Sequence, residues 1–267
     1  MSGGVSIEYA HARVSARLGT RPDERLWQQL RASRRLGVLL DTVRVSSAAP
    51  YVSGVDPRAS ADAIELAFRQ QFRIRVDEVA QWAPDGWVAA VRWTRMLIDL
   101  PALVHLASSP ALPWMHADPE LAVYAAMPAN DRRAALAAGP TAPIADALTS
   151  ETMDRTRAPH LRQEPHAAVL AWEAHWRALW PAVSAEERVD LDALARLLRR
   201  HATEFGRMDP ANAAEARLAL AARLSALLRR AAAQPAALFA WLALLALDLE
   251  RLRGLFVTRA LEEAGAL

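Results

Sequence analysis

Apolar residues recur at steps of three and four along most of the chain, which is the spacing of one face of an α-helix. Residues 59–81 give the clearest case, with Ile64, Phe68, Phe72 and Val76 on one side. Alanine, leucine and arginine dominate the sequence and β-branched residues are sparse, which favours helix over strand. We therefore predict an all-α fold.

The same pattern, combined with prolines and capping residues, predicts the individual helices. In the first part of the chain they cover residues 7–18, begin again at Pro22, and cover 33–43. Two long helices, 59–81 and 87–106, are expected to form an antiparallel hairpin. Later helices cover 167–180, 184–205 with Ser184 and Glu187 as a capping box, 209–233, and a final stretch from Pro235.

Prolines are dense between residues 108 and 165, and proline interrupts helices. We therefore predict three segments. An N-terminal helical unit covers residues 1–107, a proline-rich connection of irregular chain and short helices covers 108–165, and a C-terminal helical unit covers 166–267.

The last helix changes character along its length. Its apolar stripe runs from Leu238 to Phe256, and its first half is apolar nearly all round. Asp248, Arg251 and Arg259 lie towards the other side, so we expect a buried first half and an exposed charged face in the second. The longest uncharged apolar run, 235–247, is well short of the ~20 residues that span a bilayer. Residues 1–8 lack the pattern of a signal peptide.

Composition excludes several kinds of chemistry. The chain has no cysteine, so it can form neither disulfides nor thiolate metal sites. The formal net charge is only +2, and every basic residue counted with lysine is an arginine, so general nucleic-acid binding is not expected. No phosphate-binding loop or nucleophile motif occurs. We predict no catalytic site, no cofactor and no metal.

Histidines are the remaining candidates for metal binding. His160 and His166 flank a proline-rich loop with Glu164 between them, a metal arrangement that we weigh below an ordinary solvated loop. His201 and Glu204 share a helix face three residues apart, which is a common surface pair.

Two clusters on the later helices could bind a partner. Trp172, Trp176 and Trp180 recur at four-residue steps, which favours a core seam over a partner-binding groove. A basic cluster follows, and we interpret it first as a solvated face, second as a site for an acidic partner or phospholipid headgroups, and third as a nucleic-acid site. The cluster comprises Arg196, Arg199, Arg200 and Arg207.

Four segments carry a family resemblance. The first helix contains Tyr9-Ala-x-Ala-Arg13-Val14-x-Ala16-Arg17-Leu18, and Ile64-Glu65-Leu66-x-Phe68-Arg69 lies near the start of the hairpin. Asp99-Leu100-x-x-Leu103 ends the hairpin, and its pattern recurs as Asp248-Leu249-x-x-Leu252 after Pro235-x-x-Leu238-x-x-Trp241. In this order the segments resemble the C/d family of V/A-type rotary ATPases, named d in eukaryotes. The family's asparagine and tyrosine are replaced by Ala102 and Trp241.

The resemblance implies a mechanical role. Family members are funnels of repeated small helical bundles around a concavity, and they couple the central stalk to the membrane proteolipid ring during proton or sodium transport. They carry no catalytic residue or nucleotide, and they sit on the cytoplasmic, inner face of the membrane as peripheral components of the ATPase. Carried over, the resemblance makes five residues partner-interface candidates, with intramolecular ion pairing as the alternative: Arg13, Arg17, Glu250, Arg251 and Arg253.

Two other interpretations stay open on the sequence. One is a stand-alone helical scaffold with an unrelated protein partner. The other is an α-helical enzyme whose site is assembled from dispersed residues such as His105, His116 and Asp99.

Overall fold

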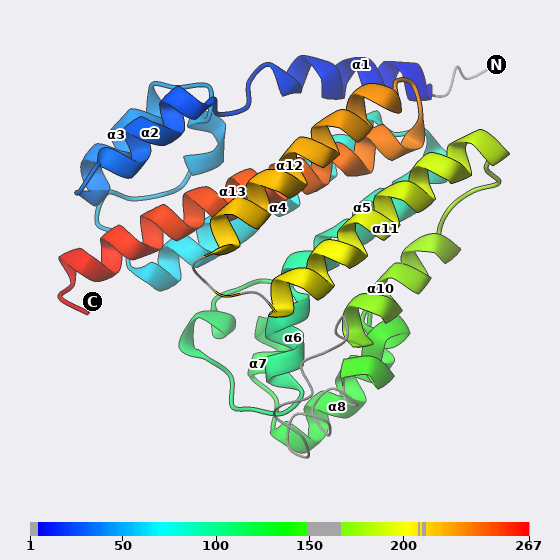
Figure 1. Cartoon of the computed structure of the whole chain (residues 1–267). Coiled ribbons are helices and arrows are strands. Elements are labelled where there is room, and N and C mark those ends of the chain that lie inside the picture. Colours follow the sequence, from blue (N-terminus) through cyan, green and yellow to red (C-terminus); the bar gives the residue numbers. More distant parts are fainter. Residues whose placement is uncertain (1–4, 149–166, 208, 210–211, 267) are drawn as a thin grey trace. The chain divides into compact units, whose positions relative to one another are not determined.

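The computed structural model describes residues 5–148, 167–207, 209 and 212–266, and within that part every regular element is a helix (Figure 1). This confirms the all-α prediction. The chain forms two compact units: the first combines the residues up to Asp85 with those from Leu224 onward, and the second runs from Gly86 to Arg223. The predicted boundaries at 107/108 and 165/166 fall elsewhere, because the final helix packs on helices from the beginning of the chain.

The first unit consists of helices from both ends of the chain. Asp23 caps α2 by accepting a hydrogen bond from the Leu26 amide, so this helix begins two residues after the predicted start at Pro22. Predicted and observed bounds agree for α1. The elements are α1 (Ile7–Leu18), α2 (Glu24–Ala32), α3 (Leu36–Arg44), the 3₁₀ helix η1 (Ala49–Val52), α4 (Ala61–Trp82), the last turns of α12 (Ala213–Arg230), and α13 (Pro235–Glu263).

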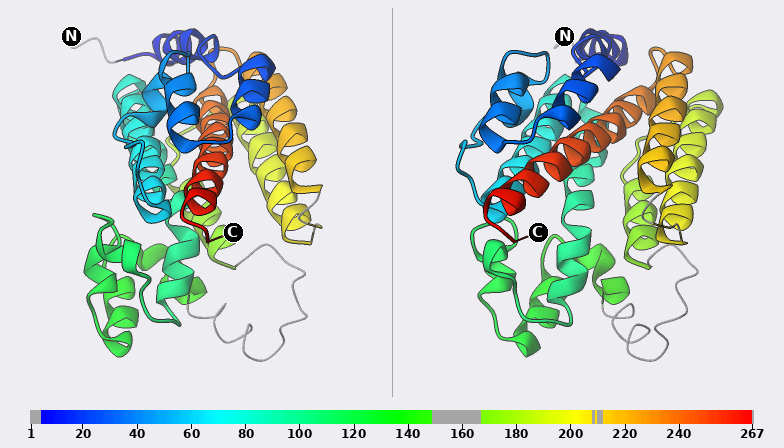
Figure 2. Two further views of the ribbon diagram at one scale, coloured as in Figure 1. Left: turned by 90° about the vertical axis from the view of Figure 1, so that its left-hand side faces the viewer. Right: turned by 60° about the vertical axis from the view of Figure 1, so that its left-hand side comes forward.

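The core of this unit lies along α13. Figures 1 and 2 show α13 running beside α4, and α1 and α3 also pack against α13. Phe68 of α4 meets Phe256 of α13 edge-to-face with 5.6 Å between ring centroids. Leu238, Trp241 and Leu245 are buried, which confirms the prediction for the first half of α13. Each such side chain contributes about 1.5–3 kcal/mol by leaving water.

The second unit begins with a broken helix. The prediction of one helix over 87–106 is wrong, because the chain tightens at Thr94 and restarts at Leu100. The Thr94 hydroxyl donates to the Val91 carbonyl at 2.7 Å, and Pro101 has no amide hydrogen to continue a helix from upstream. The elements here are α5 (Asp85–Trp93), η2 (Thr94–Ile98) and α6 (Leu100–Leu106).

The proline-rich segment contains only short elements within its described part, as predicted. They are η3 (Pro113–His116), α7 (Ala122–Ala125), α8 (Ala129–Ala138) and η4 (Ala142–Ile144). The buried side chain of Arg132 organises this segment: Nε donates to the carbonyls of Tyr124 and Met127 at 3.0 and 2.9 Å, and Nη1 donates to that of Ser109 at 2.8 Å. One guanidinium thus satisfies carbonyls that no regular backbone ladder reaches.

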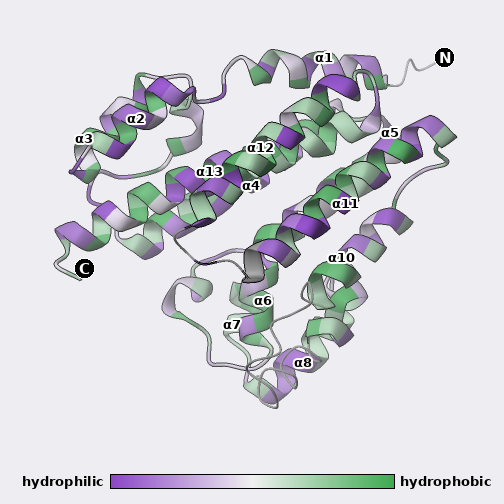
Figure 3. Cartoon of the chain, viewed as in Figure 1, coloured by the Kyte–Doolittle hydropathy of each residue, from purple (hydrophilic) through white to green (hydrophobic). Residues whose placement is uncertain are grey.

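Two longer helices complete the second unit together with the first turns of α12. They are α10 (Ala167–Ala178) and α11 (Ala185–Arg207). The predicted capping box of α11 is confirmed, since the Ser184 amide donates to Glu187 at 2.7 Å and the Glu187 amide donates to the Ser184 hydroxyl at 3.2 Å. Figure 3 shows hydrophilic and hydrophobic residues interspersed along α11, and Leu191 and Leu194 of its apolar face are buried.

Candidate interaction site

Two of the predicted interface residues lie one turn apart on α1, over an aromatic ring of α4. The guanidinium carbons of Arg13 and Arg17 lie 4.9 and 5.7 Å from the ring centroid of Trp82. Such cation–π contacts contribute about 0.5–1 kcal/mol at exposed sites and hold the cations in place. Arg13 is exposed, and Arg17 keeps 40% of its side chain exposed although Glu78 lies 3.6 Å away. Both charges therefore remain accessible to a partner.

The predicted interface residues on α13 are engaged within the first unit. Arg251 lies 3.9 Å above the centroid of Trp27 and 3.9 Å from a carboxylate oxygen of Glu24. Arg253 donates to Glu65 of α4 at 2.7 Å. Glu250 also has an intramolecular interaction. Intramolecular pairing, the alternative that the sequence left open, therefore describes the α13 residues.

Asp248 departs from its predicted place on an exposed face. Only 5% of this residue is exposed, and its two carboxylate oxygens accept hydrogen bonds from Nε and Nη2 of Arg21 at 2.6 and 2.9 Å. Burial raises the pKa of Asp248, while the hydrogen bonds and charge of Arg21 oppose that rise. The sequence signal was a single acid inside an apolar run, which calls for a buried cation from elsewhere in the chain.

The charged end of α13 also fastens the connection between α2 and α3. No side chain of the local sequence caps α3, and Glu263 takes that role by accepting a hydrogen bond from the Leu36 amide at 2.8 Å. Arg259 donates to the Ser33 carbonyl at 2.8 Å and is mostly buried. The carboxylate suits the positive end of a helix. The second half of α13 is thus a clamp within the unit as much as a surface.

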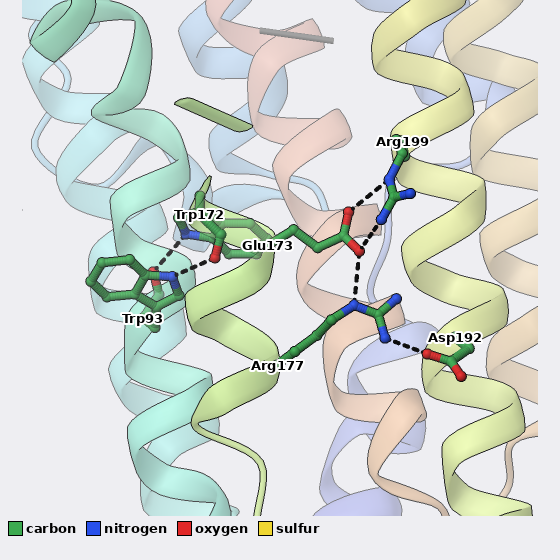
Figure 4. A network of polar contacts seen from close by, with 6 residues as sticks. All are labelled: Trp93, Trp172, Glu173, Arg177, Asp192 and Arg199. Atoms are coloured by element: carbon green, nitrogen blue, oxygen red, sulfur yellow. Dashed lines mark hydrogen bonds and ion pairs between the residues drawn. The ribbon is translucent and has the colours of Figure 1, made fainter. Parts of the chain in front are cut away.

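The second unit contains a tryptophan seam, drawn in Figure 4 with its polar neighbours. The indole of Trp93 donates to the Trp172 carbonyl at 3.1 Å, and the indole of Trp172 donates to the Trp93 carbonyl at 3.2 Å. Trp172 and Trp176 are buried and stacked, with centroids 5.8 Å apart. Trp180 meets Trp176 edge-on at 4.8 Å. The preferred interpretation of this stripe as a core seam is confirmed.

A carboxylate beside that seam joins α10 to α11. Glu173 is buried and accepts hydrogen bonds from Nε of Arg177 at 2.9 Å and from Nε of Arg199 at 3.0 Å (Figure 4). Arg177 is also bonded to Asp192. Burial lowers the pKa of Arg177, but hydrogen bonds to the two carboxylates outweigh that effect and raise the pKa above its usual value. One member of the predicted basic cluster, Arg199, therefore has a structural role.

The rest of the basic cluster is divided. Arg196 and Arg200 are exposed on α11, as expected for a solvated face, while the side chain of Arg207 lies outside the described residues. His201 and Glu204 line an open groove of about 210 Å³ between α11 and α12, together with Glu215 of the latter helix.

The dispersed enzyme candidates do not form a common site. His105 contacts the Pro110 carbonyl at 2.9 Å, and Asp99 is buried with interactions of its own. Across the described ranges, no three histidine or acidic side chains gather where they could hold a metal ion. The loop candidates His160, Glu164 and His166 lie outside the described residues.

Comparisons with models of known protein families, with curated proteins and with solved structures found no match to this chain. None of the helices in the described part is both long and apolar enough to cross a membrane.

Proposed function

We propose that this chain is a non-catalytic adaptor of a V/A-type rotary ATPase, linking the central stalk to the membrane rotor ring. The proposal begins from the sequence resemblance. One structural observation supports it most: three of the segments that carry the resemblance, in α1, α4 and α13, pack together in one unit although they come from opposite ends of the chain.

Specific contacts between these segments add to that support. Arg253 of the last motif pairs with Glu65 of the hairpin motif across 188 residues of sequence. Arg17 of the first motif lies against Trp82 and Glu78, which end the same helix. A part that transmits force needs helices fixed to each other by such long-range contacts, and it needs docking surfaces rather than an enclosed polar cleft. The open, positively charged stripe of Arg13 and Arg17 on α1 is the surface that we assign to a neighbouring component of the ATPase.

The direct test is affinity purification of the full chain from detergent-solubilised membranes of cells that express it. We expect the catalytic, stalk and proteolipid-ring proteins of the ATPase to be recovered. Their absence, with a folded chain on the column, would overturn the assignment, and recovery of one unrelated protein instead would favour the stand-alone scaffold.

A matched pair of variants locates the docking surface. Arg13 and Arg25 are both exposed arginines of the first unit. Arg13→Ser should lower the recovery of ATPase proteins about tenfold, the effect of losing ~1.4 kcal/mol at an interface residue. Arg25→Ser should leave recovery at the wild-type level. Equal losses in the two variants would remove α1 from the docking surface.

A further inference from the structure

A small cavity of the first unit is lined by polar side chains whose hydrogen-bonding capacity is only partly used. It lies between α1, η1, α4 and α13 and has a volume of about 20 Å³. Arg17, Tyr51, Arg75 and Glu78 contribute its polar groups, and the rings of Trp82 and Trp241 line it as well.

Tyr51 supplies a hydroxyl without a partner. The residue is 5% exposed, and within the described part of the chain its hydroxyl makes no hydrogen bond. Burial raises the pKa of Tyr51 to about 12, with a smaller contribution from the charge of Asp248. The phenol therefore stays protonated at physiological pH and is able to donate. Leaving such a buried donor unsatisfied costs about 1–3 kcal/mol, so a group that accepts from it is favoured.

Arg75 supplies a second open donor. Its Nη1 donates to Glu78 at 2.7 Å and its Nη2 donates to the Pro50 carbonyl at 3.3 Å. Its Nε is buried and has no hydrogen-bond partner. Two of the three donor nitrogens are thus committed, and the third remains for a ligand.

The charge around the cavity favours an anion. Arg17 and Arg75 carry two positive charges, and Glu78, which contacts both, cancels one of them. Asp248 also faces Tyr51 electrostatically, but Arg21 pairs with both of its oxygens. One positive charge is left over beside two open donors in a partly buried setting, where an anion is attracted more strongly than in bulk water.

The size of the cavity limits what can bind. One water needs about 10–15 Å³ of this kind of space, so a volume of about 20 Å³ takes only one or two oxygen atoms. A sulfate, a phosphate or a nucleotide is too large to enter. A single carboxylate has two oxygens, one negative charge, and acceptors that match a guanidinium and a phenol.

We propose that this cavity is a receptor for one carboxylate group, with the Tyr51 hydroxyl, Nε of Arg75 and the guanidinium of Arg17 as its donors. The carboxylate comes either from a free small acid or from a protein, as an acidic side chain or a chain terminus. The proposal does not rest on the rotary-ATPase assignment and survives its failure.

The test follows the thermal unfolding midpoint of the full chain during titration with sodium acetate. A ligand that binds only the folded chain raises the midpoint in a saturable way, by about 3 °C at tenfold excess over Kd. Acetamide has the same shape without the charge and should have no such effect. General salt effects are common to all variants, so the difference between variants carries the result.

Tyr51→Phe removes only the hydroxyl and should abolish the saturable rise. Tyr9→Phe is the control, because Tyr9 is an exposed tyrosine of the same unit, and it should respond as the wild type does. Arg17→Gln, at a largely exposed position, gives a second measurement should Tyr51→Phe fail to fold, and it should weaken acetate binding at least fivefold.

Two peptides then distinguish the source among carboxylates. One carries a single aspartate between blocked ends, and the other has only a free C-terminal carboxylate. A response to either at lower concentration than to acetate supports a protein ligand of that kind, whereas a response to acetate alone supports a free small acid. No acetate-dependent rise in the wild type, or an equal rise in Tyr51→Phe, would overturn the proposal and leave an ordered water as the occupant.

Discussion

Arg21 and Asp248, 227 residues apart in sequence, form a two-pronged ion pair that ties the turn after α1 to the middle of α13. The carboxylate is almost completely buried, so the arginine is what makes an acid tolerable in an otherwise apolar helix. Removing one partner of a buried pair leaves an uncompensated charge, which is far more costly than the pair itself is stabilising.

Arg21→Met should therefore lower the free energy of unfolding by about 3–5 kcal/mol at pH 7. Urea unfolding of the full chain measures it. The double variant Arg21→Met/Asp248→Leu should recover most of the loss, because no buried charge remains. A double variant as unstable as the single one would show that packing, not charge, is at stake.

The stability of the same variant should depend on pH. In the folded wild type, burial already raises the pKa of Asp248 above its unfolded value, and losing Arg21 removes the opposing influence. A raised pKa means that the folded state takes up the proton first, so stability is regained as the pH falls through the folded-state pKa. The deficit of Arg21→Met relative to wild type should shrink between pH 7 and pH 5. A deficit that grows on acidification would contradict this account.

Arg132 should be essential to the proline-rich segment, whereas its neighbour should not. Arg132 is buried among backbone carbonyls and Arg133 is exposed, so the two arginines differ only in setting. Hydrogen bonds from a charged donor contribute about 1.5–3 kcal/mol each, and Arg132→Leu should cost at least about 3 kcal/mol. Arg133→Leu should change stability by less than about 0.5 kcal/mol. Urea unfolding compares them, and equal effects would refute the role given to Arg132.

Glu173 should be more important for the second unit than either arginine it contacts. Glu173→Gln keeps the shape but removes the charge that both guanidinium groups share, and we expect a loss of about 3 kcal/mol. Arg199 is 46% exposed, so Arg199→Gln should cost no more than about 1 kcal/mol. Tryptophan fluorescence of the adjoining seam reports the unfolding. The reverse order of the two effects would place the determinant in α11 instead.

The turn between α12 and α13 carries local strain. Ala233 has φ +57°, a left-handed conformation that a side chain with a Cβ adopts at a cost. Ala233→Gly should stabilise the chain by about 0.5–1 kcal/mol. Ala232→Gly, one residue earlier with an ordinary φ, should be neutral or destabilising. The thermal midpoints of the two variants give the comparison, and a destabilised Ala233→Gly would disprove the strain.

The sequence was sufficient for the helices and insufficient for their partners. Periodicity and capping residues predicted α1 and the box of Ser184 and Glu187, because these depend on residues within one turn of each other. The break at Thr94 was missed because a threonine hydroxyl that turns back to its own backbone looks like any other helical residue in the sequence.

Long-range pairings account for the rest. The partners of Asp248 and Glu173 lie on other helices or in turns, and periodicity carries no information on which arginine of many will reach them. The cavity at Tyr51 has the same origin, since its walls come from four elements. The sequence placed five residues at an interface, and the structure reduces the open candidates to Arg13 and Arg17 by showing what the α13 residues contact.

The coupling of ATP hydrolysis to ion transport tests the central proposal most directly. The measurement uses inverted membrane vesicles from cells that lack this chain, with and without the wild-type chain restored, and records ion uptake per ATP hydrolysed. An adaptor between stalk and ring predicts that hydrolysis continues without the chain while ion uptake falls to background, and that the restored chain recovers it. Unchanged ion uptake per ATP in the absence of the chain would contradict the proposal.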